Sequence, residues 1–248
     1  MISEVHMGDC LSWMRSYQGA PIDLIVTDPP YYLPSWDGGK FFQTETRQKW
    51  ISDMSVSNLS DSYDIPGFAD LLNVIQDGKI NAYFFCNKLQ IPDYFKVYVE
   101  KYKCKFDILC WHKSNPLPTC NGKYLTDTEY ILYFRNCGKC HPQGYEDART
   151  YFLGEVNIND KKKWKHPTIK DLRIVRTLIR NSSEPGELVF DPFLGSGTTR
   201  VAAAIEGRDF IGCEIDEKFY KIQEARYNAE VRGIEEINGH TITQQSLW

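Results

Sequence analysis

A four-residue segment, Asp28-Pro29-Pro30-Tyr31, directly follows the apolar run 22–27 and combines an acid, two prolines and an aromatic ring. Proline has a fixed φ and no backbone N–H, so the two prolines leave carbonyl groups that can only accept hydrogen bonds. The set suits a planar ring that carries an NH₂ group. The amine would donate to the Asp28 carboxylate and the Pro29 carbonyl while the ring stacks on Tyr31. A proline turn whose aspartate caps a helix is the alternative that these residues allow.

A glycine-rich segment, 191–199, lies between the apolar run 187–190 and a predicted helix over 198–206. Glycine allows sharp turns and close approach to a ligand, and the amide groups of a helix N-terminus favour a carboxylate. Glu214 ends the next apolar run, where an acid can accept hydrogen bonds from ribose hydroxyls. Arg200 replaces the third glycine of a dinucleotide-binding loop, and the lysine of a phosphate-binding loop is absent. The pattern favours a small nucleoside with a carboxylate tail over a dinucleotide such as NAD.

The elements that position these residues alternate along the chain. Apolar runs typical of buried strands occupy 22–27, 81–86, 106–111, 129–134, 187–190 and 209–213, with a further strand over 4–7 before Gly8-Asp9-Cys10. Helices are predicted over 66–77, 89–102, 168–181, 198–206 and 216–232. This alternation predicts an α/β fold with a mainly parallel sheet covered on both faces. Ligands of such sheets bind beyond the carboxyl ends of the strands, where the acids above are predicted to lie.

Three segments depart from the alternation. Residues 32–65 are long, polar and aromatic, and such a loop is usually functional or mobile. Residues 135–165 have the composition of an insertion, and residues 233–248 form a polar tail.

The composition indicates an ordinary globular protein of 248 residues, 42% of them hydrophobic, with 29 basic and 33 acidic side chains and a formal net charge of −4. That charge does not predict a nucleic-acid binder, but local basic patches could still contact phosphates. No apolar run approaches the length of a membrane-spanning helix, and the first six residues lack the apolar core of a signal peptide. We therefore expect a cytoplasmic protein without a membrane partner, its eight cysteines reduced.

Taken together, the motifs resemble those of the S-adenosylmethionine-dependent amino-methyltransferases of DNA of the permuted β class, in which DPPY precedes the glycine-rich cofactor loop. The resemblance covers nearly the whole chain. It includes the segments 111–118 and 126–135 on the catalytic side, and His166-Pro167-Thr168-Ile169-Lys170 before the glycine loop. The next residue in the family is usually proline, whereas here it is Asp171.

This resemblance implies a Rossmann-like methyltransferase fold. It consists of one domain over 1–248 with a mostly parallel seven-stranded sheet, helices on both faces and a circularly permuted motif order. The loop 32–65 would act at the active site or on DNA, and 135–165 would be a small target-recognition insertion. The catalytic residues would be Asp28, Pro29, Pro30 and Tyr31. The cofactor-binding residues would be Asp9 and Cys10 at the adenine, Thr168 and Lys170 at the methionine end, and Asp28, Asp191, Phe193, Gly195, Ser196, Gly197, Thr198 and Glu214.

The activity implied is transfer of the methyl group of S-adenosylmethionine to N6 of an adenine flipped out of DNA. N4 of cytosine stays open, because the same acceptors can hold either amine. A non-catalytic DNA-binding protein that keeps the fold is the rival from another class. A NAD-dependent oxidoreductase is disfavoured by Arg200 and the proline motif. The resemblance also implies a homodimer and a cognate restriction endonuclease as partners.

Two further clusters have competing interpretations. Lys161, Lys162, Lys163 and Lys165 form the densest basic run, either a set of phosphate contacts with DNA or a solvated turn. Cys137, Cys140 and His141 could bind zinc together with Cys120, but no second C-x-x-C exists, so we expect unliganded thiols and no metal. The C-x-x-C-H pattern is also that of haem attachment, which needs an export signal that is not found here.

Overall fold

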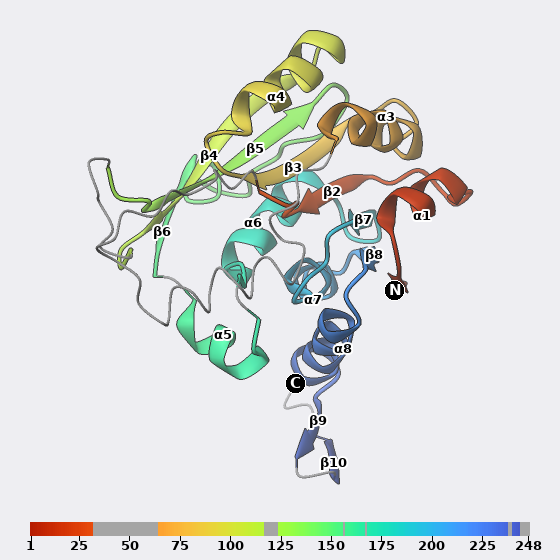
Figure 1. Cartoon of the computed structure of the whole chain (residues 1–248), viewed down its shortest axis with the longest axis vertical. Helices are drawn as coiled ribbons and strands as arrows, with labels where there is room; N and C mark the ends of the chain where they lie inside the picture. The colour runs from red at the N-terminus through yellow and green to blue at the C-terminus, as the bar shows by residue number, and fades with distance from the viewer. Residues whose placement is uncertain (32–63, 117–123, 156, 167, 238–239, 244–248) are drawn as a thin grey trace, which may run out of the picture.

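The six apolar runs, together with β1 and β6, form one eight-stranded sheet in the computed structural model, which describes residues 1–31, 64–116, 124–155, 157–166, 168–237 and 240–243. The strand order is β1-β8-β7-β2-β3-β5-β4-β6 (Figure 1). The strands are β1 (Ser3–Met7), β2 (Leu24–Thr27), β3 (Asn81–Cys86), β4 (Lys105–Lys113), β5 (Thr128–Arg135), β6 (Tyr151–Gly154), β7 (Leu188–Asp191) and β8 (Asp209–Glu214).

The sheet has a parallel part and an antiparallel part. Five neighbouring strands, in the order β1-β8-β7-β2-β3, pair in parallel, so their carboxyl ends meet at one edge of the sheet. The strand β5 then pairs antiparallel with both β3 and β4, which places the start of β5 beside the end of β3. The edge strand β6 pairs in parallel with β4.

Helices cover both faces of this sheet (Figure 1). On one face lie α1 (Cys10–Ser16), α3 (Ile65–Ile75), α4 (Ile91–Phe95) and its π-helical continuation (Lys96–Lys101), and on the other lie α6 (Leu172–Ser182) and α7 (Thr198–Ile205). The helix α8 (Glu217–Val231) packs on α7, and α5 (Ile158–Trp164) precedes α6.

The alternation of side chains along β2 explains the two layers. Ile25 belongs to the core cluster shared with α1 and α3, whereas Leu24 and Val26 belong to the cluster shared with α6 and α7. All three side chains are fully buried. A strand buried on both faces reads as a continuous apolar run, which is why this sequence predicts its position well.

The predicted Rossmann-like methyltransferase fold is confirmed, with differences of detail. The sheet has eight strands rather than seven, because β6 lies in the segment 135–165 that was expected to be an insertion. The helix predicted over 168–181 begins only at Leu172, because the Asp171 side chain accepts a hydrogen bond from the Arg173 backbone N–H and caps it.

The remaining predicted segments are less informative. Residues 32–63 of the predicted 32–65 loop lie outside the described residues, and its last residue begins α3. The tail 233–248 contains a separate antiparallel hairpin of β9 (Ile234–Ile237) and β10 (His240–Thr243). In the part of the chain that is described, no helix is long and apolar enough to cross a membrane.

Candidate active site

Four acids come together at the carboxyl edge of the parallel strands. Asp191 and Glu214 end β7 and β8, Asp28 follows β2 directly, and Asp9 follows β1 after Gly8. All four line one cavity of about 520 Å³. The other predicted cofactor-binding residues on its wall are Cys10, Thr168, Lys170, Phe193, Gly195, Ser196 and Thr198, whereas Gly197 lies behind the wall.

The glycine-rich loop is held in place from several sides. Gly195 and Gly197 have φ values of +53° and +79°, a region that glycine adopts at little cost. The backbone N–H of Gly195 donates to Oε2 of Glu214 at 2.7 Å, so the loop is tied to the end of β8. A Cβ atom on Gly197 would stand 2.8 Å from the Cβ of Gln223, so α8 needs glycine there for close packing.

Two buried arginines support the loop from α7 and α8. The guanidinium of Arg226 donates to the hydroxyl oxygen of Thr198 at 2.8 Å and to that of Ser196 at 3.3 Å. Arg200 donates to Gln223 at 2.7 Å and lies 3.9 Å from the centre of the Tyr227 ring. The residue that breaks the dinucleotide pattern therefore joins α7 to α8 and takes no part in the cavity wall.

Asp191 is a buried carboxyl group, 3% exposed. Its Oδ1 accepts hydrogen bonds from the Thr27 hydroxyl at 2.7 Å and the Phe193 N–H at 3.1 Å. Burial nevertheless raises its pKa to about 7. Burial also raises the pKa of Glu214, although the N–H groups of Asp216 and Gly195 donate to it.

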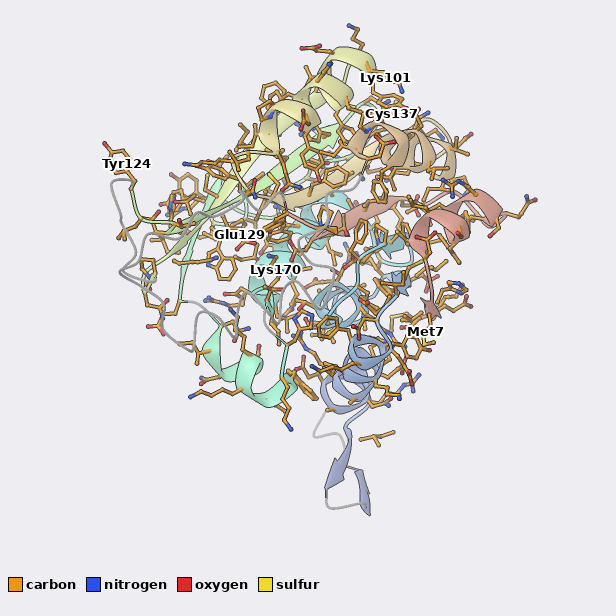
Figure 2. All side chains as sticks on the ribbon, in the orientation of Figure 1. Met7, Lys101, Tyr124, Glu129, Cys137 and Lys170 are labelled. Atoms are coloured by element: carbon orange, nitrogen blue, oxygen red, sulfur yellow. The ribbon has the colours of Figure 1, made fainter. Side chains whose placement is uncertain are left out.

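Asp28 belongs to a cluster of charged side chains. Its Oδ2 accepts from Nζ of Lys170 at 2.8 Å, and Lys170 also donates to Oε1 of Glu129. Oε2 of Glu129 accepts from Nζ of Lys113 at 2.8 Å, and the Tyr31 hydroxyl donates to Oε1 at 2.9 Å. Figure 2 shows Glu129 and Lys170 meeting near the middle of the molecule. Burial raises the pKa of Asp28, and the charge of Lys170 opposes that rise by favouring the ionised carboxylate.

The backbone after Asp28 offers a defined acceptor. The carbonyl oxygen of Pro30 accepts from Nε2 of Gln90, a fully buried side chain, at 2.8 Å. That contact fixes the turn at Pro30, which lines the cavity, whereas Pro29, whose carbonyl is the acceptor predicted for an amine, does not line it.

His166 is a buried ring that the sequence interpretation did not assign to the site. Its Nδ1 accepts from the Thr168 N–H at 3.2 Å, so the proton of the neutral ring is on Nε2. Burial lowers its pKa to about 3. Nε2 has no partner among the described residues, and a Cβ atom on Gly195 would stand 3.2 Å from it.

Other predicted residues have structural roles or lie elsewhere. The Asp9 carboxylate caps α1 by accepting from the Leu11 and Ser12 N–H groups. The lysines of the basic run lie on or next to α5 and do not line the cavity. Of these, Lys161 turns toward the charged cluster, and burial together with the charges of Lys113 and Lys170 lowers its pKa.

The cysteine cluster does not form a metal centre within the described ranges. No group of three or more His, Cys, Asp or Glu side chains is arranged there to hold a metal ion. Cys120, the fourth ligand considered above, lies outside those ranges.

The contacts of Glu129, Gln90, His166 and Arg226 were missed at the level of sequence. Glu129 carried a usable signal, because a carboxylate at the start of the apolar run 129–134 needs a buried partner. The strand order and the acids at four neighbouring strand ends are those of a Rossmann-like α/β fold, in which the DPPY strand precedes the glycine loop along the chain.

Comparison with known proteins names the family. The N6_N4_Mtase family, described as "DNA methylase", matches residues 22–225, and the chain belongs to it. The type II methyltransferase M2.MboI of Moraxella bovis is 27% identical over 247 residues, which cover 90% of this chain and 87% of that protein.

Two solved structures share the fold. The M1.HpyAVI–SAM complex is 23% identical, with a TM-score of 0.65 over 92% of this chain and 100% of that one. The PvuII DNA methyltransferase, described as cytosine-N4-specific, is 16% identical, with a TM-score of 0.61 over 90% of this chain and 86% of that one.

Proposed function

We propose that this DNA methylase transfers the methyl group of S-adenosylmethionine to N6 of an adenine flipped out of DNA. The observation that carries the proposal is the state of Asp28. Lys170 holds one of its oxygens and favours the ionised form, while Oδ1 is buried and has no partner among the described residues. A carboxylate oxygen of this kind needs a hydrogen-bond donor, and an exocyclic amine supplies one.

The cavity fits S-adenosylmethionine by the chemistry of its walls. Glu214, at the end of β8, can accept from ribose hydroxyls with the lone pairs that Gly195 and Asp216 leave free. Of the two carboxylates predicted there, that of Asp191 suits the ammonium group of the methionine end, whereas that of Asp28 is shared between Lys170 and the target amine. The hydroxyls of Ser196 and Thr198, at the start of α7, suit its carboxylate. Bound there, the cofactor supplies a methyl group on a positively charged sulfur.

The residues of the DPPY segment would prepare the amine. Hydrogen bonds to Asp28 and the Pro29 carbonyl favour a pyramidal nitrogen and so free the lone pair that the ring otherwise delocalises. The amine nitrogen held in this way would accept the methyl group as its bond to sulfur breaks, and the proton released from the methylated amine would pass to solvent. Most of the rate gain on this route comes from orientation and placed dipoles. Tyr31 would stack on the flipped base and offset part of the unstacking cost of a few kcal/mol.

N4 of cytosine is the second candidate target. It is favoured by the structural likeness to the cytosine-N4-specific PvuII enzyme, and Asp28 could accept from that amine in the same way. Adenine is preferred because the DPPY sequence resembles the adenine type more closely than the SPPY sequence typical of cytosine enzymes.

DNA contacts and partners complete the proposal. The basic run lies on or beside α5, where its exposed members could contact phosphates: Lys162, Lys163 and Lys165. Lys161 is nearer the charged cluster around Asp28. The type II designation of M2.MboI supports a cognate restriction endonuclease as a partner, and the family resemblance supports a homodimer.

The test is nucleoside mass spectrometry on DNA from a methylation-free bacterial host that expresses the chain. We expect N6-methyladenine with the wild type and with the control Asp107→Ala. This control removes an exposed carboxyl group on β4 that pairs with Arg135 of β5. We expect none with Asp28→Ala. N4-methylcytosine instead would keep the mechanism and change the base. No modified base with the wild type would refute the activity and favour a binding-only protein.

A further inference from the structure

The two carboxylate oxygens of Asp28 have different surroundings. Oδ2 accepts from Nζ of Lys170 at 2.8 Å, whereas Oδ1 is shielded from solvent and has no partner among the described residues. A Lys170 ammonium carries three donors on a flexible stem, so it could reach either oxygen unless something restrains it. The separation of the two oxygens into an occupied and an open acceptor therefore needs a cause.

Glu129 provides that restraint from the start of β5. Its side chain is 9% exposed, and it accepts from three donors: Lys170 and Tyr31 at Oε1, and Lys113 at Oε2. The antiparallel pairing of β5 with β3 brings it here, because Thr128 and Glu129 begin β5 where β3 ends at Cys86. The two lysines and the two carboxylates balance in charge, which makes their joint burial tolerable.

We propose that Glu129 is a positioning residue for methyl transfer, holding Lys170 on Oδ2 of Asp28 and fixing the Tyr31 ring by its hydroxyl. Oδ1 is thereby kept open for the target amine. The inference rests on the proposed function, since it concerns the same amine acceptor. Glu129 itself does not line the cavity, so it acts through its neighbours rather than on the substrate.

Loss of the Glu129 charge has two effects of opposite sign. The Lys170 ammonium would be released to approach Oδ1 and block the acceptor, which slows the reaction. The pKa of Asp28 would fall, because the charge of Glu129 raises it. Other titratable groups facing the cluster are Lys161 of α5, Cys86 of β3, Asp191 of β7 and His166, and a substitution at Glu129 leaves each of them in place.

The experiment compares single-turnover methylation rates of the full chain at saturating DNA and S-adenosylmethionine from pH 5 to 9. For Glu129→Gln we expect a rate about 10- to 100-fold lower, as misplacement of reacting groups produces. We also expect the acid limb of the profile to move to lower pH and the dissociation constant of S-adenosylmethionine to stay within about twofold. The matched control is Glu206→Gln, a glutamate whose side chain is 10% exposed and is held by Arg176 and Arg180; it should leave the rate, the acid limb and the cofactor affinity unchanged.

A second variant keeps the inference testable if Glu129→Gln does not fold. Lys113 contacts Glu129 at 2.8 Å, lies outside the cavity wall and is 24% exposed, and its Nζ lies 5.0 Å from the centre of the Trp111 ring. Lys113→Met therefore removes a donor to Glu129 without changing the cavity wall. We expect a severalfold lower rate with unchanged cofactor affinity.

Two outcomes would overturn the inference. The first is an active wild type with unimpaired methylation rates in both variants. The second is a lower methylation rate in the variants with an unmoved acid limb and weaker cofactor binding. Either result would mean that Glu129 is only structural. An inactive wild type would refute the proposed function itself, and this inference with it.

Discussion

Asp191→Asn should make the protein more stable at pH 8 and weaken its hold on the cofactor. The substitution keeps the shape of the side chain and an oxygen that can accept from Thr27 and Phe193, but it removes the charge. A carboxyl whose pKa rises from 3.8 to about 7 on folding weakens the fold, when ionised, by up to about 4 kcal/mol.

The sign follows from proton binding. Between about pH 4 and pH 7 the folded wild type keeps a proton on Asp191 that the unfolded chain has released, so its stability falls as the pH rises. Asparagine has no such titration. We therefore expect the free energy of unfolding of Asp191→Asn to exceed that of the wild type at pH 8 by about 1–4 kcal/mol, with a smaller difference at pH 5.

Urea unfolding of both proteins at pH 5, 6, 7 and 8 measures this difference, and Asp107→Asn on the surface of β4 is the control. The reasoning would be refuted if Asp191→Asn were less stable than the wild type at pH 8, or if it lost as much stability between pH 5 and pH 8 as the wild type does. Calorimetry gives the second readout. The affinity for S-adenosylmethionine should fall by about tenfold or more, since a hydrogen bond to a charged group contributes about 1.5–3 kcal/mol.

Three further predictions concern the loop, the buried histidine and the basic run. Gly197→Ala should lower the free energy of unfolding in urea by about 1–3 kcal/mol more than Gly186→Ala does, because both positions have φ near +80° but only at Gly197 would the new Cβ meet a side chain. Equal losses would contradict the packing argument. His166→Gln should lose less stability than the wild type as the pH falls from 7 to 4. In the wild type the folded His166 ring stays neutral down to about pH 3, whereas in the unfolded chain it takes up a proton below about pH 6.5. Parallel curves of stability against pH would argue against this role of His166. Lys162→Glu with Lys163→Glu should lower the slope of log affinity for DNA against log salt by about two, and an unchanged slope would exclude phosphate contacts.

The sequence predicts well which acids come together at the strand ends, and the reason is topological. Asp28, Asp191 and Glu214 each follow a continuous apolar run, and parallel strands buried on both faces bring such positions to one edge. One rule, that parallel strands end at the same edge of the sheet, therefore predicts that these three acids lie together. The same rule supports the expected fold class, because β2, β3, β7 and β8 are mostly buried, whereas the edge strand β1 is largely exposed.

The charged cluster around Asp28 could not be predicted in this way. Glu129 meets Lys170 only because β5 enters the sheet antiparallel beside β3, a pairing that the apolar run 129–134 does not encode. Lys170 stands in a motif that suggests the methionine end of the cofactor, and its observed partners are Asp28 and Glu129. Its role at the cofactor stays a prediction. The strand β6 was missed because four residues with alternating exposure give too short a pattern.

The pairing of β1 with β8 has a consequence for how the protein is made. Ser3 to Met7 are synthesised some two hundred residues before their partners, Phe210 to Glu214. Closing so long a segment is entropically costly and slow, and it cannot begin until the partner strand exists. A nascent chain that still lacks β8 can carry Asp28 on β2, but it has neither Glu214 nor the strand that places Asp9 beside it. Cofactor binding is therefore coupled to synthesis of β8, and products truncated before β8 are expected to be inert rather than misdirected on DNA.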